Sequence, residues 1–160
     1  MPINPTVSYL VYADLQMAAE ALLDRFTYQT TTGLKAALEF GNNRASTFTP
    51  TQAAQFIEDW KVVAHEQNTS TGFSGTVFEC LRDDPARGLI RGQLVMSCRS
   101  TEFADDAARD NQATNVMEVK EYGWAFGQIA DMKQWFDGLN APGGVLEGKT
   151  FALTGYSLGA

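Results

Sequence analysis

Strand-like and helical patterns alternate in the second half of the sequence, and this alternation restricts the fold more than any other feature. Residues 89–98 are rich in apolar and β-branched residues, which predicts a strand. A helical pattern follows over residues 115–136, and the short apolar run at residues 150–154 suits a buried strand. Two strands separated by one helix favour a right-handed parallel crossover, and therefore an α/β sheet.

A second strand pattern precedes this unit. Residues 76–81 are strand-like, and the polar turn at residues 83–88 would join them to residues 89–98 as a hairpin. With the turn centred near residue 85, Cys80 lies opposite a residue near 90, and Cys98 is about eight positions farther along, roughly 25 Å away. We therefore expect the two cysteines to be small buried hydrophobes rather than a disulfide.

Helical patterns dominate the N-terminal part of the chain. Apolar residues recur at helical spacing in three segments, which are residues 13–26, 33–40 and 50–66. The third segment has the clearest start, since Thr49 and Gln52 match a capping box and Pro50 suits the first helical position. His65 falls in its last turn, where an imidazole interacts favourably with the helix dipole.

These patterns predict a single domain, because 160 residues can bury a sizeable core. We expect a helical region over residues 1–70 and a sheet core over residues 71–160. Aromatic side chains at helical spacing are expected to pack in this core rather than to form a lipid-binding stripe. The set consists of Phe26, Trp60, Trp124 and Trp135.

Composition argues against several partners and cofactors. The formal net charge of −7 and the lack of a basic stripe argue against nucleic acid as a partner. No apolar run approaches the roughly 18 residues of a membrane span, so no transmembrane segment is predicted. The first five residues lack the basic and apolar regions of a Sec-type signal peptide. Two cysteines and one histidine without paired spacing predict neither a metal site nor a cofactor in this segment.

The clearest functional motif lies at residues 155–159, which read Gly-Tyr-Ser-Leu-Gly and match G-x-S-x-G. The motif comes directly after the strand pattern at residues 150–154, where the nucleophile elbow of an α/β-hydrolase requires it. A tight turn there would expose the hydroxyl of Ser157 as a nucleophile. The backbone N–H of Leu158 would be one donor to the oxyanion. The alternative is a glycine-rich turn that ends an ordinary strand.

A polar segment directly after residues 89–98 offers a second oxyanion donor. Hydrolases take this donor from a loop that follows an earlier strand, and Thr101 could supply it through its N–H and its hydroxyl. The alternative is a solvated ion pair between Arg99 and Glu102, with Thr101 capping a turn.

Together, these two segments resemble the class 3 lipase pattern, in which a strand ending in Arg-Gly-Thr or Arg-Gly-Ser precedes a Gly-His-Ser-Leu-Gly elbow. Three segments are similar to bacterial lipase-like proteins of the haemolysin-type calcium-repeat group, and these are residues 99–103, 124–132 and 153–159. The resemblance covers about residues 75–160. Cys98 and Ser100 replace the usual Phe and Gly, and Tyr156 replaces the usual His. Ser100 and Tyr156 would alter the mouth of the site.

The resemblance implies an incomplete α/β-hydrolase fold that ends at the elbow. This fold would have a helical N-terminal region, a β-hairpin and a strand-helix-strand crossover in a mostly parallel sheet. The implied reaction is hydrolysis of a carboxylic ester, with a lipid as the expected substrate, through an acyl-enzyme on Ser157. Thr101 and the amide of Leu158 would form the oxyanion hole. Transient contact with a lipid interface, calcium in C-terminal repeats and secretion by a C-terminal signal are also implied, with a cytoplasmic location as the alternative.

The other triad members do not follow Ser157 in these residues. In α/β-hydrolases the acid and then the histidine come after the serine. His65, the single histidine, precedes Ser157, as do the clustered acids Asp105, Asp106 and Asp110. We therefore expect the parent protein to be a serine esterase and the 160-residue chain alone to be inactive or nearly so. An acyltransferase that uses the same serine and a non-catalytic binding module with the same fold are the alternatives.

Overall fold

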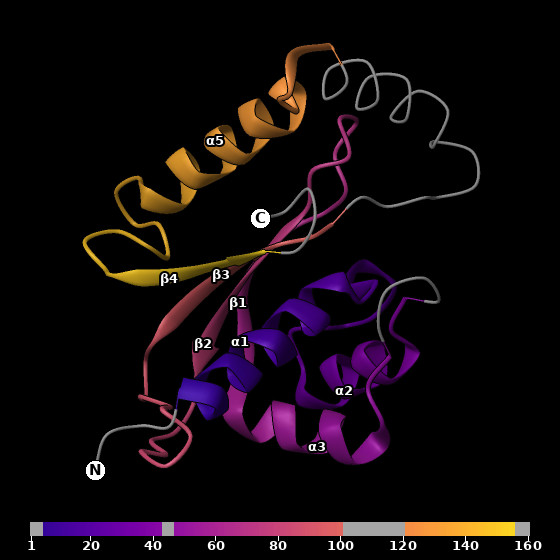
Figure 1. Ribbon diagram of the computed structural model, residues 1–160, viewed down its shortest axis with the longest axis vertical. Helices are drawn as coiled ribbons and strands as arrows, with labels where there is room; N and C mark the ends of the chain where they lie inside the picture. The colour runs from indigo at the N-terminus through magenta and orange to yellow at the C-terminus, as the bar shows by residue number, and fades with distance from the viewer. Residues whose placement is uncertain (1–4, 43–46, 101–120, 156–160) are drawn as a thin grey trace.

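The computed structural model describes residues 5–42, 47–100 and 121–155, which form a sheet with helices on both faces (Figure 1). This arrangement confirms the mixed α/β class. The elements are α1 (Pro5–Glu20), the 3-10 helix η1 (Leu23–Arg25), α2 (Thr31–Phe40), α3 (Pro50–Asp59), β1 (Trp60–Glu66), β2 (Gly75–Cys80), β3 (Leu94–Cys98), α5 (Phe126–Asn140) and β4 (Phe151–Gly155).

The sheet of the described residues has four strands in the order β1-β2-β3-β4. The pairs β1–β2 and β2–β3 are antiparallel, whereas β3 and β4 are parallel. The predicted hairpin and the parallel pairing across the crossover are therefore confirmed. The expectation of a mostly parallel sheet is wrong for these strands, because two of the three pairings are antiparallel.

The second hairpin strand starts later than the sequence predicted. Residues 89–93 are not part of β3, and they belong to a long connection in which Gly92 has a φ of +80°. The Gly92 N–H donates to the carbonyl of Cys80 at 2.8 Å, which closes the end of the hairpin. As expected, Cys80 and Cys98 are buried and free. Cys98 lies opposite Gly75, five residues along β2 from Cys80.

The helix between β3 and β4 is interrupted, so the prediction of one helix over residues 115–136 is wrong. Glu121 and Tyr122 are helical, Gly123 takes a φ of +75°, and α5 starts only at Phe126. A positive φ is incompatible with a continuous right-handed helix, and glycine adopts it at low cost. The predicted start near residue 115 lies outside the described residues.

The N-terminal helices differ in part from the sequence prediction. The first helix begins before residue 13 and ends at Glu20, so the predicted segment 13–26 is wrong at both ends. The prediction for α2 is confirmed, and Gly41 ends this helix with a φ of +60°. For α3, the capping box of Thr49 and Gln52 is also confirmed.

The predicted helix over residues 50–66 is wrong in its second half. It ends at Asp59, and Trp60–Glu66 forms β1 instead. The register of β1 with β2 shifts between Val62 and Ala64. This irregularity lets Val63 and Ala64 both pack against one face of the sheet while Val62 packs against the other. Such spacing imitates a helical period in the sequence.

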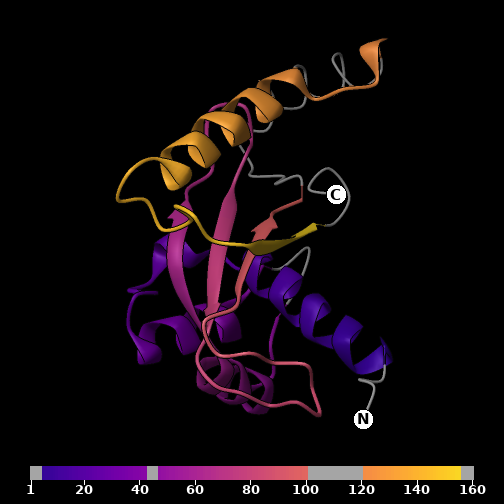
Figure 2. The same ribbon diagram turned by 90° about the vertical axis from the view of Figure 1, so that its left-hand side faces the viewer.

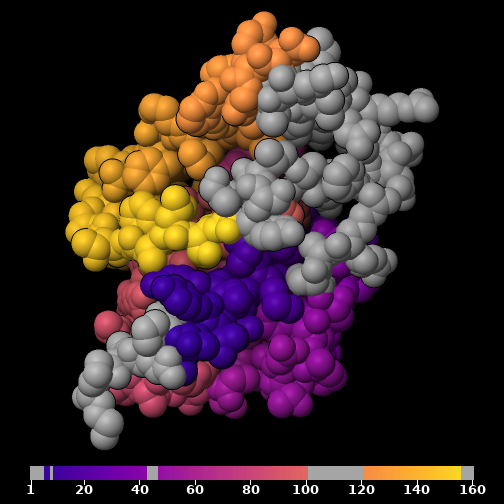
Figure 3. Space-filling view, viewed as in Figure 1, coloured from indigo at the N-terminus to yellow at the C-terminus, as the bar shows by residue number. Residues whose placement is uncertain are grey.

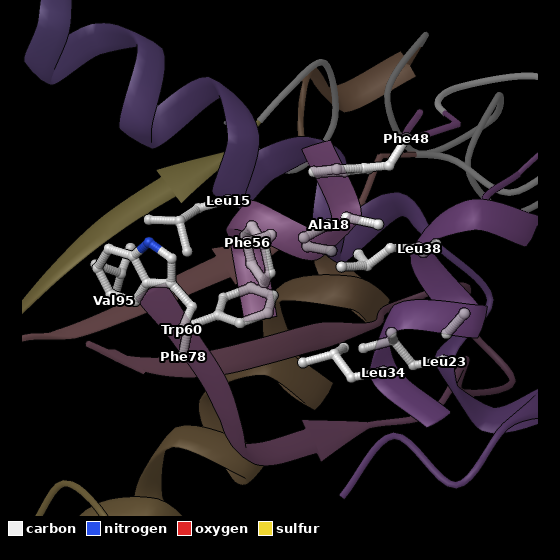
Figure 4. Packing of buried hydrophobic residues seen from close by; sticks show 14 of the residues in the cluster. Leu15, Ala18, Leu23, Leu34, Leu38, Phe48, Phe56, Trp60, Phe78 and Val95 are labelled. Carbon is white, nitrogen blue, oxygen red and sulfur yellow. The ribbon is translucent and has the colours of Figure 1, made fainter. Parts of the chain in front are cut away.

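Each face of the sheet has its own core. Alternation along β2 and β3 directs Phe78 and Val95 to one face and Val77 and Met96 to the other. The first face packs against α1, α2 and α3, and Figure 4 shows the side chains that fill this layer. The second packs against α5 and the turn that follows it, on the opposite side of the sheet (Figure 2).

At the end of the described sheet, β4 is only partly covered. Leu153 is 63% exposed and Phe151 is 36% exposed, so the expectation of a buried strand is wrong for the described residues. Figure 3 shows β4 at the surface between α5 and α1. Contrary to expectation, Trp124 is 62% exposed and lies outside the core. Trp60 is buried in the core, as expected. In the described ranges, no helix has the length and apolar character needed to cross a membrane.

Candidate functional site at the carboxyl ends of two parallel strands

The parallel pair β3–β4 brings two sequence-predicted segments to one edge of the sheet. Ser97 pairs with Thr154, and Cys98 pairs with Gly155, so the two strands end level with each other. Arg99, where the polar segment begins, and Gly155, where the G-x-S-x-G motif begins, therefore lie at the same edge of the sheet. Adjacent parallel strands lie about 4.8 Å apart.

The three predicted catalytic residues, Ser157, Thr101 and Leu158, lie outside the described residues. The structure describes the residues that lead to them, namely Arg99 and Ser100 after β3 and Gly155 at the end of β4. Arg99 is buried, and its backbone N–H donates to the backbone carbonyl of Ser74 at 2.9 Å. This bond continues the pairing between β2 and the end of β3 by one residue.

A buried carboxylate from α1 binds the end of β3. One oxygen of Glu20, Oε1, accepts the backbone N–H of Ser100 at 2.7 Å, and the other, Oε2, accepts its hydroxyl at 2.9 Å. Glu20 is only 4% exposed. The hydroxyl of Ser100 is therefore directed to α1. The expectation that this side chain alters the mouth of the site stays a prediction, because Ser157, Thr101 and Leu158 lie outside the described residues.

Gln16, one turn earlier on α1, extends this polar contact. Its side-chain N–H donates to Glu20 Oε1 at 2.8 Å and to the carbonyl of Cys98 at 3.3 Å. Its side-chain oxygen accepts the hydroxyl of Ser97 at 2.7 Å. Gln16 and Glu20 thus bind Ser97 and Cys98 at the end of β3 and Ser100 just beyond it.

Sequence reasoning missed both α1 residues. They are four positions apart, so they lie on one side of the helix, next to the buried Leu15 and Ala19. A polar i,i+4 pair beside an apolar stripe was the signal that could have identified them. This signal does not identify Ser100 as the partner of Glu20, because the two residues are 80 positions apart in the sequence.

His65 lies on β1, and its predicted position at a helix end is wrong. Its Nδ1 is 2.9 Å from the hydroxyl of Thr76, and its Nε2 is 3.6 Å from Asp24 Oδ1. His65, Thr76, Ser97 and Thr154 form one row across the sheet. Three strand spacings, roughly 14 Å, separate the backbones at the two ends of this row. The imidazole is fully buried, so it is not accessible at the edge formed by β3 and β4.

The protonation of His65 is disfavoured in the folded protein. Burial lowers the pKa of this imidazole, and the nearby carboxylate of Asp24 partly offsets that effect. Burial also raises the pKa of the thiols of Cys80 and Cys98. Protonated, buried thiols are weak nucleophiles and weak metal ligands.

A second polar cluster lies at the end of α3. Asp59 is 1% exposed, and its two oxygens accept the side chains of Arg82 and Arg87, each at 2.6 Å. A hollow of about 250 Å³ lies beside this cluster, and Asp14 and Trp60 are among its lining residues. Both arginines come from the connection between β2 and β3, so Asp59 holds this connection against α3.

Across residues 5–42, 47–100 and 121–155, no three or more His, Cys, Asp or Glu side chains are grouped in a way that could hold a metal ion. The acidic residues Asp105, Asp106 and Asp110 lie outside these ranges.

No family model, curated protein or solved structure matches the chain. Residue chemistry and the geometry of the sheet are therefore what support a function for this chain.

Proposed function

We propose that these residues belong to a serine-dependent hydrolase of carboxylic esters, with Ser157 as the nucleophile and a lipid as the expected substrate. The observation that carries the proposal is the parallel register in which Cys98 lies opposite Gly155. Ser157 comes two residues after Gly155, and Thr101 comes three residues after Cys98. A nucleophile and an oxyanion donor from these positions would both lie at the carboxyl edge of the sheet, where α/β folds bind their ligands.

The proposed reaction has two steps. The Ser157 oxygen attacks the ester carbonyl carbon while a general base takes its proton, and the carbonyl oxygen becomes an oxyanion. Thr101 and the N–H of Leu158 donate to this oxyanion. The tetrahedral intermediate then expels the alcohol, which receives the proton, and leaves an acyl-enzyme. Water, deprotonated by the same base, releases the acid and restores Ser157.

The general base is not among the described residues at the proposed site. His65 is the single histidine in the sequence, and it is buried on β1. The proposal therefore assigns the base to a part of the natural protein beyond residue 160, with the α/β-hydrolase fold as the proposed architecture. Because the described residues supply no general base at the proposed site, one alternative is also favoured, a non-catalytic binding module with this fold.

Hydrolysis of p-nitrophenyl esters by the natural protein that contains these residues tests the proposal. Ser157→Ala should lower kcat by at least about 10⁴-fold, and Thr101→Ala should lower it by about 10²–10³-fold because one oxyanion donor is lost. Thr101→Ser should restore most of the activity, because it keeps the N–H and the hydroxyl.

Ser70→Ala is the matched control, because Ser70 is an exposed serine in the connection between β1 and β2. Its activity should equal that of the wild type. Full activity in Ser157→Ala would rule out this serine as the nucleophile, and a folded wild type without activity on any ester would favour the binding module. Transfer of the acyl group to an added alcohol, with little free acid, would identify an acyltransferase.

A further inference from the structure

We propose that Glu20 is a positioning residue, which fixes Ser100 after the end of β3, and Ser100 directly precedes the proposed oxyanion donor Thr101. The catalytic part of this inference rests on the proposed function. The structural part rests on the contacts of Glu20 with Ser100, which both belong to the described residues.

The contact constrains the backbone and not only a side chain. Because Glu20 accepts the N–H and the hydroxyl of the same residue, it restrains both the main chain and the side-chain torsion of Ser100. Thr101 is the next residue, and consecutive Cα atoms are 3.8 Å apart across a trans peptide. The peptide that carries the Thr101 N–H starts at the carbonyl of Ser100, so Glu20 restrains the residue to which the proposed donor is attached.

The energetics favour a specific role for the carboxylate over simple packing. A buried carboxylate loses its hydration, and it is retained at such a position only when hydrogen bonds compensate for that loss. From the described residues, Glu20 receives three hydrogen bonds, donated by the N–H and hydroxyl of Ser100 and by Gln16. Hydrogen bonds to a charged acceptor are stronger than those between neutral groups, so the strand end is held in one conformation.

α1 itself is well placed to provide a rigid support. Leu15, Ala18 and Ala19 of this helix are buried against the sheet, and Gln16 binds Ser97 and Cys98 of the same strand. These contacts fix the position of Glu20 relative to β3 independently of its own hydrogen bonds to Ser100. A positioning group held in this way keeps an oxyanion donor aligned without reorganisation during the reaction.

Glu20→Gln in the natural protein tests the inference, with Glu39→Gln as the matched control. Glu39 is a partly exposed acid of α2 that pairs with Lys35, away from β3. Glu20→Gln should speed hydrogen exchange at the Ser100 amide by about tenfold or more, while the Phe78 amide in β2 stays protected. It should lower kcat for an ester by about 10- to 100-fold and change KM little.

Inhibition by a trifluoromethyl ketone separates positioning from a loss of folded protein. This inhibitor forms a tetrahedral adduct with a serine nucleophile, so its inhibition constant should rise in proportion to the loss of kcat. A fall in the amount of folded enzyme would leave that constant unchanged. Ser100→Ala should have a smaller effect than Glu20→Gln, because the backbone N–H still binds Glu20.

The outcomes distinguish this inference from the proposed function. Unchanged exchange at the Ser100 amide in Glu20→Gln overturns the inference, whatever the activity. Faster exchange with unchanged kcat and an unchanged inhibition constant overturns the positioning role and leaves the esterase proposal standing. A folded wild type without esterase activity overturns both the proposed function and the catalytic part of the inference.

Discussion

Glu20 illustrates a limit of sequence reasoning at the scale of single residues. A glutamate on a helix is normally interpreted as solvent-exposed, because isolated buried charges are costly. Its burial here depends on Ser100 and Gln16, which supply the hydrogen bonds. Ser157, by contrast, could be singled out from sequence, because the motif and its place after a strand are local features.

His65 leads to a prediction about pH. Its pKa is lowered in the folded protein, so the unfolded chain binds the proton first as pH falls. The contribution of His65 to stability is therefore complete above its unfolded pKa of about 6.5 and is lost as pH falls below that value. The slope should be at most about 1.4 kcal/mol per pH unit, as measured by urea unfolding at a series of pH values.

His65→Gln should flatten this pH dependence while lowering stability at neutral pH, because the bond to Thr76 is perturbed. The charged groups that act on His65 are Asp24, which favours the protonated form, and Arg99, which opposes it. Equal slopes for the wild type and the variant between pH 5 and pH 7 would show that another group is responsible.

At the scale of elements, long-range pairing explains why β1 was missed. Trp60, Val63 and Ala64 continue the helical spacing of α3, and short apolar segments are ambiguous between helix and strand. Pairing with β2, together with the shift in register after Val62, decides the outcome. Where the signal was local, as in the capping box of Thr49 and Gln52, the sequence was sufficient.

The capping box gives a prediction for α3. Thr49 accepts the N–H of Gln52, and the side chain of Gln52 accepts the N–H of Thr49 in return. Thr49→Ala should lower the free energy of unfolding by about 1 kcal/mol. Thr51→Ala, in the exposed first turn, should have less effect. Equal losses in chemical denaturation would argue against a role of the cap in stability.

The Asp59 cluster gives a second prediction at this scale. Asp59→Ala should lower the free energy of unfolding by about 2 kcal/mol, because the hydrogen bonds of this buried carboxylate to two partly exposed arginines then no longer join α3 to the connection between β2 and β3. The control is Glu79→Ala, since Glu79 forms a partly exposed pair with Lys61 and should contribute about 0.5 kcal/mol. A smaller loss for Asp59→Ala than for Glu79→Ala would contradict this account.

For the whole molecule, the alternation of patterns predicted the α/β class and the parallel pairing of β3 and β4. The alternation of patterns did not predict the antiparallel strand β1, because this segment forms a strand only through its pairing with β2. The break at Gly123 was also missed, since the apolar spacing continues across it. The sequence predicted that the strand before the motif pairs with β3, whereas Ser157, Thr101 and Leu158 stay predictions. It missed α1, whose contact with Ser100 exists only in the folded chain.

The central claim is the proposal that Ser157, two residues after the end of β4, is a reactive nucleophile. Treatment of the natural protein with a fluorophosphonate, followed by peptide mass mapping, tests it most directly. We predict a covalent phosphonyl adduct on Ser157 that is absent in Ser157→Ala and retained in Ser70→Ala. An adduct on another residue, or none on a folded protein, would contradict the claim.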